Sequence, residues 1–208
     1  MRIFCSIVLS FLANLVSAQG FLAHVSPDKV DGMFVNWTKG RLLFDSGDSI
    51  NCDIRFDQLN QNMDVRYQGV ELEIPFPDIA SFNFYDSAKH RTRFFEKVVV
   101  ESGKVVLVEY IFKANKASLL EERFIRKFHM AYPDPVTFEK RKFRITMPVE
   151  KKFLYNAATK KVLLMSRSNL LIITNDKARE MKNFLHEQRL RMETDEDFIL
   201  ALTHYDRL

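Results

Sequence analysis

Apolar and polar residues alternate along the first half of the chain in short segments separated by turn-forming residues. Ile50–Phe56 is apolar at every second position, and it follows the Asp- and Gly-containing segment Asp45–Ser49. Asp and Gly adopt the backbone conformations of tight turns, so this pattern predicts a β-hairpin. The pattern recurs around Gln68–Gly69 and Glu101–Lys104. Residues 40–112 are therefore predicted to hold six or seven short strands, as in a small barrel or sandwich.

The C-terminal part, residues 113–208, has a mixed pattern. Residues 117–130 fit a helix, because Ser118–Glu121 has the form of a capping box and apolar residues then recur every four positions. Their many Phe and Ile residues fit a strand equally well, so both interpretations stay open. Strand patterns follow at residues 143–147, 153–155 and 162–164, the last two joined by a turn.

Two helices are predicted at the C-terminus, near residues 175–191 and 194–206. Asn175 is a candidate N-cap of the first helix and Thr194 of the second. Three acidic residues, Asp195–Asp197, stand where a helix dipole favours negative charge. The predicted fold is therefore α+β and mostly β. Antiparallel hairpins form a small barrel or sandwich-like body, which the two C-terminal helices close.

The first 18 residues have the pattern of a signal peptide. One Arg precedes an apolar run, and Val16-Ser17-Ala18 places small or β-branched residues where signal peptidase requires them. The run is shorter than the roughly 20 residues that span a bilayer, so no transmembrane segment is expected after cleavage. We expect an exported protein that is periplasmic, outer-membrane-associated or extracellular. Residues 19–39 would then be a lead-in segment before the strands.

The overall composition, 47% hydrophobic and 28% charged residues, is that of a folded globular protein. Charge is uneven, because residues 113–192 hold 19 Lys and Arg against 8 Asp and Glu, whereas the segments before and after them are acidic. Such a region suits an anionic lipid or polysaccharide, although its basic groups also suit a solvated surface. Nucleic acid is not an expected partner of an exported chain without a recognition motif. After cleavage Cys52 is the only thiol, and we interpret it as a small apolar residue of a strand.

No catalytic, cofactor-binding or metal-binding residues are predicted. His186-Glu187 begins like a zinc-protease motif, but Leu190 replaces the second histidine that the motif requires. The carboxylates of Asp45 and Asp48 are better explained by turn formation than by calcium binding.

Several short segments together carry a family resemblance: Gly40–Ser49 with Asp53–Asp57, Ile79–Phe82, the strand pair Phe153–Tyr155 and Val162–Leu164, and the C-terminal Asp176–Leu185 and Leu202–Asp206. In these segments the chain resembles a family of uncharacterised exported proteins common in Bacteroidetes. The resemblance implies an envelope location and a β-rich body, and it implies no activity.

These observations lead to a functional hypothesis. We expect an exported cell-envelope protein that is a non-catalytic binding or structural module and has no cofactor. Its partners would be other envelope proteins or an anionic surface. Two alternatives stay open: a hydrolase-type enzyme whose site is assembled from dispersed residues, and a peripheral binder of anionic lipid or polysaccharide through residues 113–192. The sequence does not fix the oligomeric state.

Overall fold

A computed structural model describes residues 36–57, 62–133 and 140–208, which belong to one compact unit, Phe34–Leu208. The predicted signal peptide, residues 1–18, and nearly all of the predicted lead-in lie outside the described residues.

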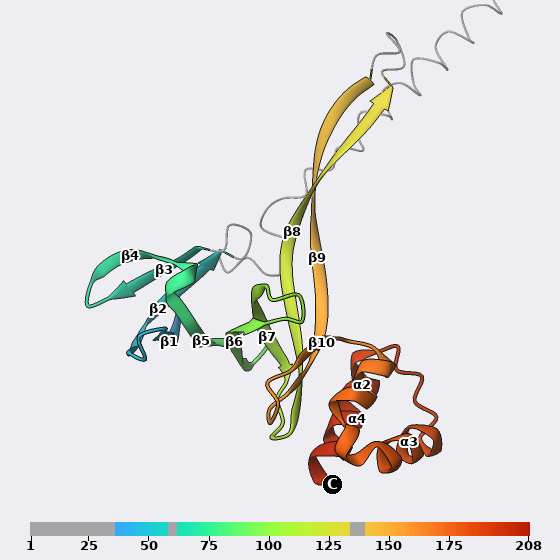
Figure 1. The fold of residues 1–208 in the computed structure, drawn as a ribbon. Helices are drawn as coiled ribbons and strands as arrows, with labels where there is room; N and C mark the ends of the chain where they lie inside the picture. The colour runs from blue at the N-terminus through green and yellow to red at the C-terminus, as the bar shows by residue number, and fades with distance from the viewer. Residues whose placement is uncertain (1–35, 58–61, 134–139) are drawn as a thin grey trace, which may run out of the picture. The chain divides into compact units, whose positions relative to one another are not determined.

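The described strands form one antiparallel sheet of ten strands in the order β10-β9-β8-β7-β6-β5-β1-β2-β3-β4 (Figure 1). The strands are β1 (Thr38–Phe44), β2 (Ser49–Asp57), β3 (Asn62–Tyr67), β4 (Val70–Pro75), β5 (Ile79–Asp86), β6 (Arg91–Val99), β7 (Val105–Phe112), β8 (Ala117–Pro133), β9 (Lys140–Asn156) and β10 (Val162–Leu164). A short 3-10 helix, η3 (Phe76–Asp78), links β4 to β5. The edge strands β10 and β4 do not pair, so the sheet is open. The mostly β fold is confirmed, and the predicted barrel is not supported.

The predicted hairpins of the N-terminal half are confirmed. β1 pairs with β2, β3 with β4 and β6 with β7, and each pair is antiparallel. Gly47, Gly69 and Gly103 adopt positive φ in the three connecting turns, which explains why the turns need glycine. β1 also pairs with β5 and so lies between β5 and β2.

Residues 117–130, which the sequence left open between helix and strand, lie in the strand β8. Ser118 pairs with Tyr155 of β9 rather than capping a helix. The four-residue spacing of Leu120, Phe124 and Phe128 misleads because four is an even number, so such residues also share one face of a strand. Both Leu119 and Leu120 are fully buried, which shows that the sheet is covered on both faces at this point.

The two predicted C-terminal helices are confirmed as α3 (Ala178–Glu187) and α4 (Asp195–Arg207). A third helix, α2 (Arg167–Ile173), precedes them, with a 3-10 turn, η4 (Asn175–Lys177), before α3. Thr194 caps α4 as predicted, because its side chain accepts a hydrogen bond from Asp197 N. The prediction that Asn175 caps a helix is wrong, since Asn175 begins the 3-10 turn. α2 was missed; Ser166 caps it by accepting from Asn169 N.

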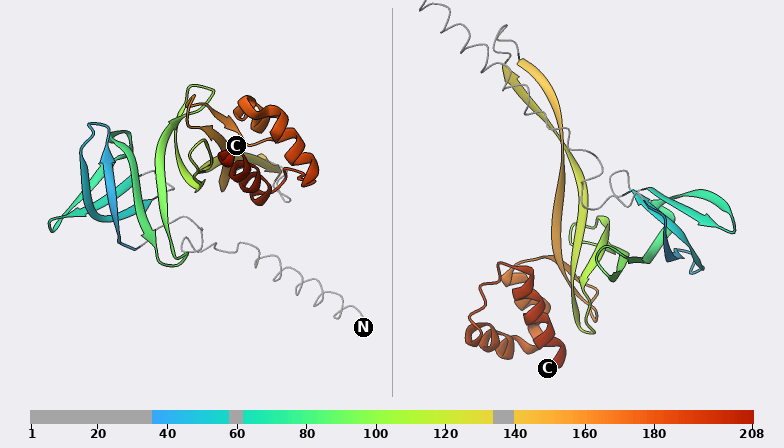
Figure 2. Two further views of the ribbon diagram at one scale, coloured as in Figure 1. Left: turned by 90° about the horizontal axis from the view of Figure 1, so that it is seen from below. Right: turned by 180° about the vertical axis from the view of Figure 1, so that it is seen from behind.

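Three apolar clusters hold the sheet and helices together. One packs the C-terminal helices against β8–β10, as Figure 2 also shows, and includes Leu119, Leu154 and Met181. A second, rich in Phe, lies under the N-terminal strands and includes the stacked rings of Phe82 and Phe95, with centroids 4.6 Å apart. The third lies on the opposite face of β6–β10 and includes Val106, Leu120, Phe153 and Val162.

Candidate functional site: the β8–β9 ribbon

β8 and β9 run on past their neighbours in the sheet (Figure 1). They pair with each other from Ala117–Asn156 to Pro133–Lys140. By contrast, β7 pairs with β8 only as far as Glu121, and β10 reaches β9 only at residues 153–155. Residues 122–133 and 140–151 therefore form a two-stranded segment, which we call the ribbon. An isolated two-stranded segment is marginally stable in water, so the ribbon must be anchored at its root.

The ribbon concentrates basic residues. It holds eight Lys and Arg against two acidic residues, Glu122 and Glu150, both of which lie at its root. Arg126 and Lys127 are exposed on β8. Four more basic residues lie in β9, within residues 140–144. The basic region predicted for residues 113–192 thus has its densest part on one narrow element.

One face of the ribbon also carries apolar side chains. Phe124 lies opposite Val149, and Arg126 opposite Met147. The guanidinium of Arg126 stands 4.9 Å from the centre of the Phe128 ring. The side chain of Met147 is 51% exposed, although Met is usually a buried residue. This face therefore presents apolar and cationic groups side by side.

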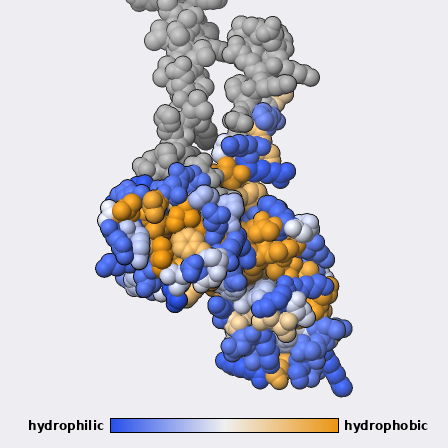
Figure 3. All heavy atoms as spheres, turned by 60° about the vertical axis from the view of Figure 1, so that its left-hand side comes forward, coloured by the Kyte–Doolittle hydropathy of each residue, from blue (hydrophilic) through white to orange (hydrophobic). Residues whose placement is uncertain are grey.

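A groove lies at the root of the same face. Its apolar floor includes Val106, Phe153 and Val162, and its volume is about 380 Å³. Lys104 and Lys151 line it, and their ammonium groups stand 5.9 and 5.2 Å from the centre of the Phe124 ring. The groove and the apolar face of the ribbon are thus continuous. Figure 3 shows apolar residues gathered in patches on one face of the molecule, with hydrophilic residues around them.

A network of buried charges anchors the ribbon from the other face of the sheet. On β6, the buried Arg93 donates through Nε to Glu109 Oε1 at 2.8 Å, and its Nη2 contacts Glu109 Oε2. Oδ2 of Asp86 lies 3.5 Å from Nη1 of Arg93, and Nη2 of the more exposed Arg91 lies 2.9 Å from Oε1 of Glu109. Because these contacts join β5, β6 and β7, they fix the strand from which the ribbon diverges.

The network continues across β8 and β9 to the helices. Arg123 donates to Glu121 at 2.6 Å, and Lys152 bonds Asp195 of α4 at 2.5 Å. Burial raises the pKa of Glu121, and the charge of Arg123 opposes that shift in part. These carboxylates are already held by cations, so the network acts as an anchor and offers no free acid or base.

The residues that the sequence singled out do not converge. Cys52 lies half-buried on β2, and burial raises the pKa of its thiol to about 11, which makes it a weak nucleophile. His186 is exposed on α3. Asp45 pairs with Lys97 at 2.6 Å and Asp48 accepts from Ser46, so both serve the fold. Within the part of the chain that the structure describes, no group of three or more His, Cys, Asp or Glu residues is placed to hold a metal ion.

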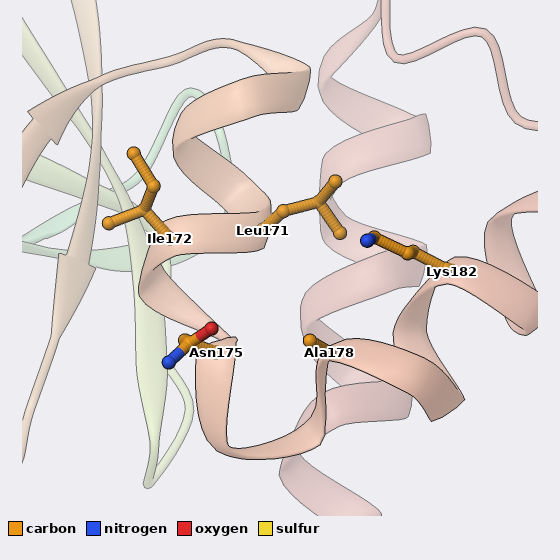
Figure 4. Close-up of a pocket in the computed structure, with 5 residues that line it drawn as sticks. All are labelled: Leu171, Ile172, Asn175, Ala178 and Lys182. Atoms are coloured by element: carbon orange, nitrogen blue, oxygen red, sulfur yellow. The ribbon is translucent and has the colours of Figure 1, made fainter.

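A further pocket of about 280 Å³ lies between the C-terminal helices (Figure 4). Its lining residues are Leu171, Ile172, Asn175, Ala178 and Lys182. Only Lys182 among them is charged, so the pocket lacks the convergent polar groups that a catalytic site needs.

Comparison with known proteins gave no match: no family model, curated protein or solved structure is significantly similar to this chain. Across the described residues, no helix combines the length and the apolar character needed to cross a membrane.

Sequence reasoning found the basic region but not the ribbon. The ribbon could not be predicted because residues 117–130 fitted both a helix and a strand. A helix there would have distributed the basic residues around its surface. Two signals were available. Basic residues are concentrated at residues 123–127 and 140–144, and the prolines Pro133 and Pro135 between these clusters favour a break in regular structure.

Proposed function

We propose that this chain is an exported, non-catalytic module of the cell envelope that attaches to an anionic lipid surface through the ribbon. The observation that carries the proposal is the ribbon's composition. Eight Lys and Arg residues stand against two acidic residues, and both acidic residues lie at the root. Each basic side chain near an anionic membrane contributes about 1 kcal/mol of attraction, so a cluster of this size supports binding.

The apolar face of the ribbon favours lipid over polysaccharide. Exposed Met147 and half-buried Phe124 and Phe128 would enter the boundary between headgroups and acyl chains, while Arg126 and Lys127 stay with the phosphates. A polysaccharide would use the charges but offers no apolar layer for these side chains.

Other features support export and a non-catalytic role. Residues 1–18 have the pattern of a cleavable signal peptide, and the resemblance to uncharacterised exported proteins agrees with that assignment. The carboxylates Glu109 and Glu121 are held by Arg93 and Arg123, so they lack the freedom of a general acid or base.

Vesicle binding tests the attachment. The purified chain should co-sediment with vesicles containing phosphatidylglycerol, release at about 0.5 M salt, and ignore phosphatidylcholine vesicles. The double variant Arg126→Glu/Lys127→Glu should bind at least about tenfold more weakly. A matched control, Arg179→Glu/Lys182→Glu, reverses two exposed charges on α3. Equal losses in both variants, or equal binding to both vesicle types, would refute attachment through the ribbon.

A separate measurement tests export. The chain recovered from its native cells should begin at Gln19, as intact-mass spectrometry would show. Recovery with Met1 still attached, in the soluble intracellular fraction, would refute export.

A further inference from the structure

The edge strand β4 has two chemically different rows of side chains. Val70 and Leu72 point to one face and are 55% and 52% exposed, whereas Glu71 and Glu73 point to the other face and are also exposed. Only β3 pairs with β4 among the described strands, so the outer backbone groups of β4 have no ladder partner. An unpaired edge of alternating apolar residues is a template for another strand.

The β8 edge of the ribbon has the complementary pattern. From Glu122 onward β8 has no described neighbour except β9. One face of this edge carries Arg123, which also pairs with Glu121, and Lys127, and the other carries Phe124 and Phe128 with Arg126 between them. A strand laid beside it would meet basic residues on one face and apolar residues on the other.

The edge is also open at its root, where β7 and β8 diverge. A groove of about 350 Å³ lies there and includes Val105–Leu107 of β7 and Glu122 of β8. Lys104, Val106 and Glu122 line this groove and the apolar-floored groove as well. The two grooves therefore adjoin at the gap between these strands. The outer edge of β9 is less suitable, because Pro148 cannot donate a hydrogen bond to a new strand.

We infer that β4 of one copy of this chain adds as a strand to the β8 edge of a second copy. Glu71 and Glu73 would lie beside Arg123 and Lys127, and the apolar row of β4 beside Phe124 and Phe128. Like charges disfavour the pairing of two ribbons or of two β4 strands, so the contact joins unlike surfaces. Such a contact is heterologous, so it produces rings or open-ended chains of molecules.

The opposite charges of two parts of the chain support this arrangement. Residues 19–112, which include β4, hold 10 Lys and Arg against 14 Asp and Glu, whereas residues 113–192, which include the ribbon, hold 19 against 8. The inference does not depend on lipid binding, although the contact would also use Phe124 and Phe128 of the ribbon's apolar face.

Analytical ultracentrifugation of the purified chain, without vesicles, tests the inference. We expect concentration-dependent oligomers at low salt that dissociate as salt is raised. Glu71→Lys/Glu73→Lys should weaken self-association at least about tenfold. Arg126→Glu/Lys127→Glu should do the same, because it reverses Lys127 beside the acidic row and places a carboxylate at position 126 beside the apolar row. Mixing these two double variants should restore association, because both edges of the first variant are basic and both edges of the second are acidic. The Arg179→Glu/Lys182→Glu variant is the matched control and should associate like the unmodified chain.

The quadruple variant with both pairs reversed separates this inference from the proposed function. It should self-associate again while binding anionic vesicles as weakly as Arg126→Glu/Lys127→Glu. Hydrogen exchange should show slower exchange of backbone amides within residues 122–129 in the oligomer. A monomer at all concentrations, a closed dimer, or no recovery on mixing would overturn the inference.

Discussion

Glu109 of β7 and Glu121 of β8 are directly opposite each other in the sheet, and each carboxylate is held by its own arginine. Arg93 holds Glu109 and Arg123 holds Glu121. Two opposed carboxylates destabilise a strand pair, so the arginines make this pairing possible. The pair marks the last rung that β7 and β8 share before the ribbon begins. The buried charges thus explain how a basic ribbon can emerge from an apolar sheet.

Replacement of Arg93 should destabilise the fold strongly. Arg93→Ala leaves Glu109 and Asp86 buried without their main counterion, which costs about 3–5 kcal/mol in the free energy of unfolding. Arg91→Ala removes a half-exposed partner of the same Glu109 and should cost about 1 kcal/mol or less. Urea denaturation of both variants measures the difference. Equal losses of unfolding free energy in the two variants would show that the burial of Arg93 adds nothing to the stability of the fold.

The stability of the fold should depend on pH through Glu121. Burial raises its pKa above the ordinary value of 4.5, so the folded state favours the protonated form. This contribution is fully present below the unfolded pKa and is lost as pH rises through the folded pKa. Relative to Glu121→Gln, the unmodified chain should therefore lose unfolding free energy as pH rises above about 4.5. Parallel stability profiles of the two proteins would contradict a raised pKa.

Gly40 should not tolerate a side chain. It pairs with both Cys52 and Phe84, and an added Cβ would collide with the carbonyl oxygen of Asn83 and come within 2.6 Å of Ile54 Cδ1. We expect Gly40→Ala to lower the unfolding free energy by about 1–3 kcal/mol through overpacking. In Gly47→Ala the added Cβ meets no neighbouring atom. The unfolding free energy should fall only by the cost of a positive φ at an alanine, about 1 kcal/mol. Thermal denaturation ranks the two variants, and the reverse order would refute the close approach.

The thiol of Cys52 should react slowly. Because its pKa is about 11 rather than 9.0, the thiolate is about a hundredfold scarcer near pH 8. Iodoacetamide should therefore modify the folded chain much more slowly than the urea-unfolded chain, and the folded rate should keep rising beyond pH 9. A folded rate that levels off near pH 9 would contradict the raised pKa.

The sequence predicted those elements whose signals are local. The hairpins of the N-terminal half depend on turn residues such as Gly47 and Gly103, and the cap of α4 depends on Thr194. The opening of the sheet and the length of β8 depend on contacts between distant residues, such as the pairing of Phe124 with Val149. The periodicity of apolar residues could not predict the length of β8, because a four-residue repeat fits both a helix face and a strand face.

The candidate site was predicted only as an excess of charge. Nothing near Arg126 in the sequence shows that it lies opposite Met147, so the mixture of cationic and apolar groups became visible only with the register of β8 and β9. The buried network was missed for the same reason, since Arg93 and Glu109 are 16 positions apart and look like ordinary surface residues. Alternation offered one hint, because both occupy positions in their strands where apolar side chains are expected.

A fluorophore on the ribbon gives the most direct test of lipid attachment. In the chain that begins at Gln19, with Cys52→Ser, the separate variants Met147→Cys and Ile172→Cys each introduce one labelling site. The replaced side chains are 51% and 50% exposed and lie on the ribbon and on α2. With an environment-sensitive label, vesicles containing phosphatidylglycerol should shift the emission at position 147 to shorter wavelength and leave position 172 unchanged. Equal shifts at both positions, or no shift at position 147 while the chain is bound, would contradict attachment through the ribbon.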